Sequence, residues 1–535
     1  MSKGMIVAPQ PEAVEAGAIV LKNGGNAVDA AITCALVQTV VDPQQCGIAG
    51  VGSMHLYLPS KNFHGLIDFH TTAPGLVREG MWADLIEGEA RDGFGFFLKG
   101  KVNEVGYKSI LIPGSLKAFY EAIVDFGTID WKDAVRPAIE HARQGFIVRP
   151  SVYEFWTRAD NLGRMPTSEK LGFTEAGRRI YFNEAGDLWG PGSRVKNQDM
   201  VRTLMRIQQS GADVFYKGDM AEEIAVDMEK HGGYLSREDL KSYETSRVEP
   251  IWGEYRGYHI ATNPPPGGGI MILEMLNILE KFDLAAMGHN TPEYIRTVAE
   301  AMKYATVDKD AKVGDPAFVD VPINQLLSKD YAGKLAELIR SGKKANVLRL
   351  DPMEESKNTT HISIIDANGN AVSMTHSLGM PSGVITKGLG FMYNGCMLSF
   401  DPRPGRVGSL APGKRRFTTM SPTIVFKGDD PYIIIGAPGG ARITIAILQS
   451  ILNVLDFDMS MFEAVAAPRF AANSNIIDIS NRIPSFFTHE LEAMGYPIVR
   501  SHLSYAFAGV HGIRVKDEAL EGGADPGLDG MALEV

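Results

Sequence analysis

Two adjacent threonines, Thr359 and Thr360, occupy a position where the chain could acquire a catalytic group. They follow a polar segment, DPMEESKN, and open an alternating run, HISIID, that is typical of a β-strand. A threonine hydroxyl is a weak nucleophile, and a free α-amine on the same residue is one of the few groups that can activate it. That amine has an unperturbed pKa of about 7.7 to 8.0, which suits a general base. The hydroxyl would become reactive only after the bond before it is cut.

The same residues also have a purely structural interpretation. A threonine at the start of a strand is usually a β-branched residue in a position that favours β-branching. Chemistry at the threonine pair therefore needs support from residues elsewhere in the chain, and from the elements that would place them nearby.

Length and composition limit the class of protein. The chain has 535 residues, of which 44% are hydrophobic, so it can bury a large core. Length alone suggests about two to four domains, although one large layered unit is also allowed. The formal net charge of −11, without a basic stripe, argues against nucleic acid as the main partner. The sequence shows neither a signal-peptide pattern nor an apolar run of about 18 residues, so we expect a cytoplasmic protein that does not bind membranes.

Cysteine usage predicts neither disulfides nor a metal site. Cys34, Cys46 and Cys396 are too few and too scattered for a disulfide framework, and no CxxC or HExxH spacing is present. We expect free, mostly buried thiols. No metal or organic cofactor is implied either.

Hydrophobic periodicity predicts helices before residue 358 and a sheet after it. The predicted helices cover residues 10–25, 28–41, 113–147, 198–230 and 292–306. Strand-like runs HISIID, NAVSMTHS, PTIVFKG and PYIIIGA then follow in quick succession, and the runs ITIAILQSILNVL and SMFEAVAAPRF are suited to cover such a sheet as helices. The spacing is not that of regular βαβ units, which favours an antiparallel arrangement.

Several longer stretches resemble the gamma-glutamyltranspeptidase family, whose members are self-cleaving N-terminal-nucleophile (Ntn) hydrolases. The likeness is carried by LKNGGNAVDAAI, YRGYHIATNPPPGGGIMILEMLNILEKFD, NTTHISIIDANGNAVSMTHS, MSPTIVF and GAPGGARI. The resemblance implies an α+β fold, a four-layer αββα sandwich. It also implies that Thr359 is the nucleophile and cuts the Asn358–Thr359 bond of one precursor. A large subunit, 1–358, and a small subunit, 359–535, would stay together as one αββα unit, and a homodimer of this pair is left open.

The resemblance further implies groups that support the nucleophile. Ser377 stands where the family has a threonine whose hydroxyl contacts the nucleophile, and Gly439 and Gly440 match the glycines that bind the oxyanion. A two-residue turn in DANGN would pair Thr360 with Ser377 and turn Thr359 to the other face. A bulge or a longer turn is needed to bring Thr359 to Ser377, and Thr375 is the polar alternative.

The residues that would bind the substrate depart from the family pattern. His70, in IDFHTTAP, replaces the arginine that clamps the α-carboxylate, and a lost charge partner of this kind costs about 2 to 5 kcal/mol. Cys396 and Ser399 replace the Gln and Asp that hold the α-amine, and Gly379 replaces an asparagine. The anionic partner for a substrate ammonium is therefore missing.

Thr418 and Thr419 stand for a pair of serines that helps to bind the carboxylate. Arg416 precedes them where the family usually has proline, and it either supplies a positive charge from a new direction or, as is commoner for arginine, faces solvent. The segment between Ser399 and Thr418 is shorter than the lid of many members, which would leave the pocket more open.

These features favour an autoprocessed amide hydrolase or acylase. Its substrate would be a small-molecule amide whose acyl group differs from gamma-glutamyl. The family includes such divergent members, among them cephalosporin acylases. The first alternative is a genuine gamma-glutamyl transferase or glutathione hydrolase that tolerates the substitutions. The second, of another class, is an unprocessed binding paralogue that retains the fold.

Overall fold

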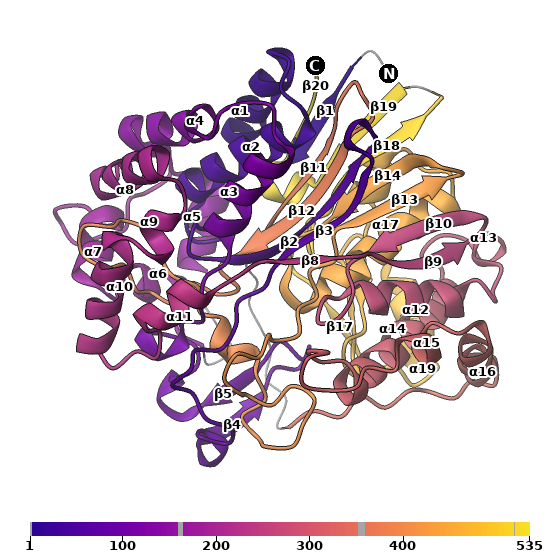
Figure 1. Cartoon of the computed structure of the whole chain (residues 1–535). Helices are drawn as coiled ribbons and strands as arrows, with labels where there is room; N and C mark the ends of the chain where they lie inside the picture. The colour runs from indigo at the N-terminus through magenta and orange to yellow at the C-terminus, as the bar shows by residue number, and fades with distance from the viewer. Residues whose placement is uncertain (1–2, 159–163, 351–358, 518) are drawn as a thin grey trace.

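Two large antiparallel β-sheets form the centre of the molecule (Figure 1). This computed structural model describes residues 3–158, 164–350, 359–517 and 519–535. In sheet order, the first sheet contains β20 (Met531–Glu534), β1 (Met5–Ala8), β11 (Thr360–Ile365), β12 (Ala371–Ser377), β2 (Val51–Leu58), β3 (Phe63–Phe69) and β8 (Ser246–Val248). The second contains β19 (Ala519–Ala524), β18 (His511–Lys516), β14 (Asp430–Gly436), β13 (Thr423–Lys427), β10 (Tyr258–Thr262) and β9 (Ile251–Tyr255).

Helices cover the outer face of the first sheet, on the left of Figure 1. The longer ones are α1 (Pro11–Lys22), α2 (Ala27–Val41), α3 (Ser115–Phe126), α4 (Trp131–Gln144), α8 (Gln198–Ser210) and α10 (Asp219–Lys230). Shorter helices on this side are α5 (Pro150–Thr157), α6 (Thr167–Leu171), α7 (Glu175–Tyr181), α9 (Asp213–Tyr216) and α11 (Arg237–Ser242). Every residue of α2 is buried, as expected for a helix that is apolar all round.

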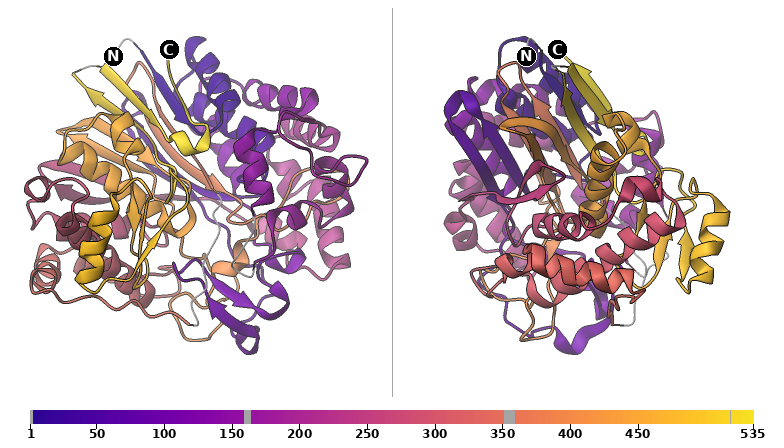
Figure 2. Two further views of the ribbon diagram at one scale, coloured as in Figure 1. Left: turned by 180° about the vertical axis from the view of Figure 1, so that it is seen from behind. Right: turned by 90° about the vertical axis from the view of Figure 1, so that its right-hand side faces the viewer.

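A second group of helices covers the outer face of the other sheet, as the side view in Figure 2 also shows. This group consists of α12 (Gly269–Leu279), α13 (Leu284–Met287), α14 (Pro292–Lys312), α15 (Ile323–Leu326), α16 (Lys329–Arg340), α17 (Ile443–Leu455), α18 (Met461–Ala466) and α19 (Ser485–Ala493). Three small sheets lie outside the sandwich: β4 (Ile86–Glu89) with β5 (Phe96–Leu98), β6 (Phe146–Ile147) with β7 (Arg194–Val195), and β15 (Phe470–Ala471) with β16 (Ile477–Ile479) and β17 (Ile498–Arg500).

Three apolar cores correspond to the three spaces between four layers. One joins the first sheet to its helices and contains Ile362 and Ile364 of β11. A smaller one, with Val7 and Ile365, lies between the two sheets, and the third joins the second sheet to its helices. Successive residues of β11 therefore alternate between the helical side and the sheet-to-sheet side, as the pleat requires. The predicted αββα sandwich is confirmed.

Most of the predicted elements are present, with different boundaries. Residues 113–147 form two helices, because Gly127 ends α3 and α4 begins four residues later. Residues 198–230 also divide, since Gly211, with φ of 68°, ends α8. The helix predicted over 292–306 continues to Lys312. The three cysteines are free and buried, as expected.

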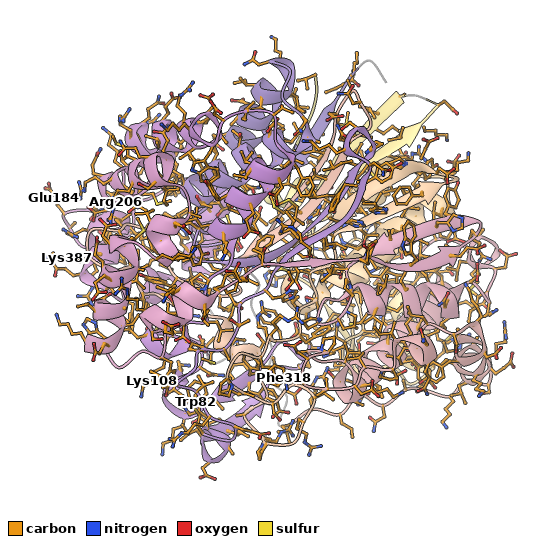
Figure 3. All side chains as sticks on the ribbon, in the orientation of Figure 1. Trp82, Lys108, Glu184, Arg206, Phe318 and Lys387 are labelled. Carbon is orange, nitrogen blue, oxygen red and sulfur yellow. The ribbon has the colours of Figure 1, made fainter. Side chains whose placement is uncertain are left out.

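The segment that follows β12 leaves the first sheet and reaches the helices that cover it. The segment 378–395 crosses to the helices of the first group, where Thr203 Oγ1 donates to Leu389 O at 2.7 Å and Asn197 Nδ2 donates to Gly390 O at 2.7 Å. Lys387, from the same segment, lies on the outer flank of these helices, on the same side as Arg206 (Figure 3). None of the helices in the described ranges has the length and apolar character needed to cross a bilayer.

Asp366 connects the β11–β12 turn to the N-terminus of α2. Its buried carboxylate accepts hydrogen bonds from the backbone N–H groups of Ala27 (3.0 Å), Asn368 (2.9 Å) and Asn370 (3.1 Å). A negative charge at the start of a helix is also favourable for the helix dipole. One side chain thus fixes both the shape of the turn and the position of the hairpin against the helical layer.

The Asp366→Ala variant tests this connection. We expect a loss of about 1 to 3 kcal/mol in the free energy of unfolding, because buried N–H groups lose their acceptor. Chemical denaturation measures this change. The matched control, Asp84→Ala, removes an exposed carboxylate and should change the free energy by less than about 0.5 kcal/mol. Equal stability of the two variants would contradict the role of Asp366.

Candidate active site

The turn between β11 and β12 sets which side chains meet at the strand ends. Asp366 N donates to Asn370 O at 3.0 Å, and Gly369 N donates to Asp366 O at 3.0 Å, so residues 367–369 form a three-residue loop. Gly369 has φ of 76°, which suits glycine at the end of such a loop. The resulting register pairs Thr360 with His376. The longer turn, rather than the two-residue one, is therefore present.

This register places Thr359 and Ser377 together at the end of the hairpin. The Thr359 Oγ1 lies 3.1 Å from Ser377 Oγ, to which it donates. Ser377 Oγ also accepts from the backbone N–H of Gly379 at 2.7 Å, which fixes the serine side chain. Thr359 is buried, on the side of the hairpin that faces the second sheet. Asn358, the other residue of the predicted scissile bond, lies outside the described residues.

Gln45 is a site residue that the sequence interpretation missed. Its side-chain Oε1 accepts a hydrogen bond from Thr359 N at 2.9 Å, and its backbone carbonyl accepts from Ser377 Oγ at 3.4 Å and from Leu378 N at 3.1 Å. Gln45 thus contacts both the nitrogen that would become the α-amine and the supporting serine. Its only sequence signal is a Gln pair just before the glycine-rich segment that leads into β2.

The neighbouring hydroxyls are occupied elsewhere. Thr360 points to the helical side, where its Oγ1 lies 3.1 Å from Gln38 Nε2 and 3.2 Å from Gln10 Oε1. Thr375 Oγ1 lies 2.8 Å from the Nδ1 of His361. Burial lowers the pKa of His361 well below its usual value, so the ring is neutral. Ser377, and not Thr375, is the hydroxyl in contact with Thr359.

The loop after β14 carries Gly439 and Gly440 in backbone conformations that favour glycine. Their φ angles are 144° and 57°, and a Cβ on Gly439 would lie 2.3 Å from the Cβ of Ala508. Among the described residues, neither N–H donates a hydrogen bond to a protein acceptor. Thr419 Oγ1 donates to the Gly440 carbonyl at 2.6 Å and so orients this peptide. Two N–H groups are available here for an oxyanion.

Four of the predicted substrate-binding residues line one cavity of about 610 Å³. These four residues are Ser399, Arg416, Thr418 and Thr419. Residues 405–408 of the short segment that precedes Arg416 line it as well. Thr418 N donates to Pro266 O at 2.9 Å, and Gly268 N donates to Met420 O at 3.2 Å, so the NPPPGGG loop holds the Thr418–Thr419 segment in place.

Arg416 is buried, so the expectation that it faces solvent is wrong. Only 3% of the residue is exposed. Its Nη1 donates to Ser399 Oγ at 3.2 Å and to Phe417 O at 3.3 Å, whereas Nε and Nη2 have no hydrogen-bond partner among the described residues. Cys396 lies nearby, and its Sγ is 3.4 Å from Leu378 O. The residues predicted to replace the family's amine site thus surround a guanidinium.

His70 is part of a separate charged cluster and is not among the residues that line the cavity. Its Nδ1 contacts the carboxylate of Asp68, and Asp68 also pairs with Arg415 at 3.3 Å. Burial alone would raise the pKa of Asp68, but His70 and Arg415 together lower it below its usual value. Contact of His70 with substrate stays a prediction. In the described part of the chain, no group of three or more His, Cys, Asp and Glu side chains could hold a metal ion.

Comparisons with known proteins agree with this geometry. The sequence profile described as gamma-glutamyltranspeptidase matches residues 13–535. The acylase ACY 1 proenzyme of Pseudomonas sp. (strain V22) is 37% identical over 94% of this chain and 88% of its own length. The glutathione hydrolase proenzyme of Escherichia coli (strain K12) is 34% identical over 98% of this chain and 90% of its own.

Comparison with solved structures also points to this family. The crystal structure of cephalosporin acylase from Bacillus halodurans superposes with a TM-score of 0.87 and 29% identity, and the match covers 99% of this chain and 96% of that one. Together, the αββα layers, the threonine and serine at the hairpin end and the match over nearly the whole length show that the chain belongs to the gamma-glutamyltranspeptidase family of Ntn hydrolases.

Proposed function

We propose that this chain is the precursor of an acylase that cleaves a small amide through an acyl-enzyme on Thr359. The observation that carries the proposal is the 3.1 Å contact between Thr359 Oγ1 and Ser377 Oγ at the start of a buried strand. The acylase and glutathione hydrolase relatives are both described as proenzymes, which supports processing here. The cleaved bond would be Asn358–Thr359, and the two products would be residues 1–358 and 359–535.

In the first, intramolecular reaction, Thr359 Oγ attacks the Asn358 carbonyl carbon and the peptide C–N bond breaks. The products are an ester on the threonine oxygen and a free α-amine, and water then hydrolyses the ester. The new amine stays beside Gln45 Oε1, which already accepts from this nitrogen at 2.9 Å. Ser377, whose Oγ accepts from Gly379 N, holds the threonine hydroxyl in position.

In the second reaction, the α-amine takes the proton of Thr359 Oγ as this oxygen attacks the substrate amide. The N–H groups of Gly439 and Gly440 would stabilise the oxyanion, and the loss of one such donor typically costs about 2.7 to 4 kcal/mol. The protonated amine returns its proton to the departing amine of the substrate. Water, deprotonated by the same α-amine, then hydrolyses the acyl ester and restores the threonine.

An acyl group without an α-ammonium fits the cavity better than gamma-glutamyl. The positions where the resemblance implies an amine site hold Cys396, Ser399 and Gly379, and none of these is anionic. In their place lies the guanidinium of Arg416, hydrogen-bonded to Ser399. Two positive charges about 4 Å apart repel each other by about 4 kcal/mol at an effective dielectric constant of about 20. This repulsion favours the acylase over a glutathione hydrolase.

The identity of the nucleophile is tested by Thr359→Ala. The precursor should stay a single band on denaturing electrophoresis and should cleave no amide, because both reactions use this hydroxyl. Thr360→Val is the matched control, because its hydroxyl faces Gln10 and Gln38. That variant should still be processed, with N-terminal sequencing finding residue 359 first. Processing of Thr359→Ala would disprove the assignment.

Gln45→Met tests the positioning of the α-amine. An acceptor stabilises the ammonium form and raises its pKa, so removal of the Gln45 oxygen should lower it. The acidic limb of the pH profile of kcat/KM should then shift to lower pH, and the maximal rate should fall by roughly tenfold as the amine loses its orientation. Neighbouring Gln44→Met should leave the acidic limb in place. A Gln45→Met profile that coincides with that of the wild type would exclude this role.

Two anilides separate the acylase from the alternative glutathione hydrolase. The gamma-glutamyl and glutaryl anilides have the same carbon chain and carboxylate, and they differ in the α-ammonium. We expect kcat/KM to be at least about tenfold lower for the gamma-glutamyl anilide, because of the repulsion by Arg416. Steady-state kinetics of the processed protein gives the ratio. A ratio that favours gamma-glutamyl would establish the alternative function.

A further inference from the structure

Gln45 contacts the site through its side chain and its backbone at the same time. Its Oε1 accepts from Thr359 N at 2.9 Å, and its backbone carbonyl accepts from Ser377 Oγ at 3.4 Å and from Leu378 N at 3.1 Å. In the precursor, Thr359 N is the nitrogen of the bond to be cut. One residue therefore contacts both this nitrogen and the serine that binds the attacking hydroxyl.

A tight turn after α2 fixes the position of Gln45. Gln45 N donates to Asp42 O at 3.1 Å, which closes a turn with Pro43 at its second position, where proline is favoured. The buried Asp42 carboxylate accepts from Gln10 Nε2 at 2.7 Å, so the start of the turn is held as well. On the other side of the turn, Leu378 N donates to the Gln45 carbonyl. The backbone of Gln45 is thus held at both its N–H and its carbonyl.

The backbone carbonyl of Gln45 also sets the direction of the hydrogen bonds between the hydroxyls. Ser377 Oγ donates to this carbonyl, and it accepts from Thr359 Oγ1 at 3.1 Å and from Gly379 N at 2.7 Å. A carbonyl can only accept, so the hydrogen of Ser377 is directed to Gln45 and its lone pairs to the donors. The Thr359 hydroxyl is therefore oriented to lose its proton toward Ser377.

We propose that Gln45 is a catalytic residue of precursor cleavage, and that its side-chain oxygen stabilises the positive charge that develops on Thr359 N. The inference rests on the proposed function and deepens it, because it assigns a group to the first reaction, in which no free α-amine exists. Gln45 Oε1 contacts the nitrogen before the reaction begins. The side chain therefore needs no movement to act.

The positive charge follows from the balance of atoms in the cleavage. As Thr359 Oγ bonds to the carbonyl carbon, the hydroxyl proton moves to Thr359 N and the carbonyl oxygen becomes an oxyanion. The nitrogen then holds its own hydrogen and the transferred one, and it is positively charged until the C–N bond breaks. The electron pair of this bond goes to the nitrogen, which leaves as a neutral amine. The oxyanion forms the carbonyl of the ester.

The contact with Gln45 becomes stronger as this charge develops. An amide N–H forms a neutral hydrogen bond, whereas an ammonium N–H forms a charge-assisted one, which is roughly twice as strong. Gln45 therefore binds the transition state more tightly than the intact precursor, and only such a difference accelerates a reaction. Thr359 is only 6% exposed, so solvent is poorly placed to replace this acceptor.

The test follows the cleavage of newly made precursor. Cell-free synthesis of the full chain is stopped, and denaturing electrophoresis records the loss of the full-length band with time. The variants are Gln45→Met, which has no acceptor, and Gln45→Glu, which keeps one and adds a negative charge. Gln45 is partly exposed, so this charge can be hydrated. Gln325→Met, at an exposed glutamine of α15, controls for the loss of one amide.

We expect Gln45→Met to be cleaved about tenfold more slowly than the wild type, and Gln45→Glu at least as fast as the wild type. Gln325→Met should be cleaved at the wild-type rate. Hydroxylamine, which cleaves esters, should not restore the rate of Gln45→Met, because the slowed step precedes the ester. In the processed enzymes, the acidic limb of kcat/KM should shift to lower pH in Gln45→Met and to higher pH in Gln45→Glu, because a carboxylate raises the pKa of the neighbouring amine.

Three results would overturn the proposal. Equal cleavage rates for Gln45→Met and the wild type would remove Gln45 from the first reaction but leave the proposed function intact. Equal losses in Gln45→Met and Gln45→Glu would make the residue merely structural. Restoration of the Gln45→Met rate by hydroxylamine would move its effect to the hydrolysis of the ester. If the wild-type precursor were neither cleaved nor active on any amide, the proposed function itself would fail, and the inference with it.

Discussion

The register of one hairpin is the constraint on which the candidate site depends. The pleat of β11 turns alternate residues toward the helices and toward the second sheet, so a shift of one residue would exchange Thr359 with Thr360. The three-residue loop at 367–369 fixes the register in which Thr359 meets Ser377. Asp366 in turn holds this loop through three hydrogen bonds from Asn368 and Asn370, and it accepts a fourth from the first N–H of α2. The chemistry at one end of the hairpin is thereby set by hydrogen bonds at the other.

Much of the architecture could be predicted because it follows from local pattern. Alternating apolar and polar residues predicted the strands β11 to β14, and apolar periodicity predicted the helices α2 and α17. Burial of an element on one face or on all sides leaves such a pattern in its sequence. Boundaries were less certain. Gly127 and Gly211 end helices within stretches that otherwise retain helical periodicity, and the first sheet places β1 beside β11 although more than 350 residues separate them. Such long-range pairing has no local signature.

Site residues that belong to a sequence motif could be predicted. Residues that join the site only through contacts in the folded structure could not. Thr359, Ser377, Gly439 and Gly440 came from the resemblance, and the structure brings the first two into contact. Gln45 was missed because its role depends on two hydrogen bonds across the fold, and a glutamine next to another glutamine predicts nothing by itself. The burial of Arg416 was missed for a similar reason, because arginine is usually exposed and the space above Gly379 becomes visible only in three dimensions.

The order of strands in the two sheets has a further consequence for the cleaved protein. In the first sheet, β1, which precedes residue 358 in the chain, lies between β11 and β20, which both follow it. In the same way β2, from the first part of the chain, pairs with β12, from the second. In the second sheet, β10 pairs with β13 across the same division. Two polypeptides interleaved in this way share both sheets and the helical layer on the second sheet, so they cannot part as rigid bodies. Scission of the precursor would consequently create a new chain end, while the contacts between the two products would be the ones that the precursor already has. Dilution alone would not separate the products.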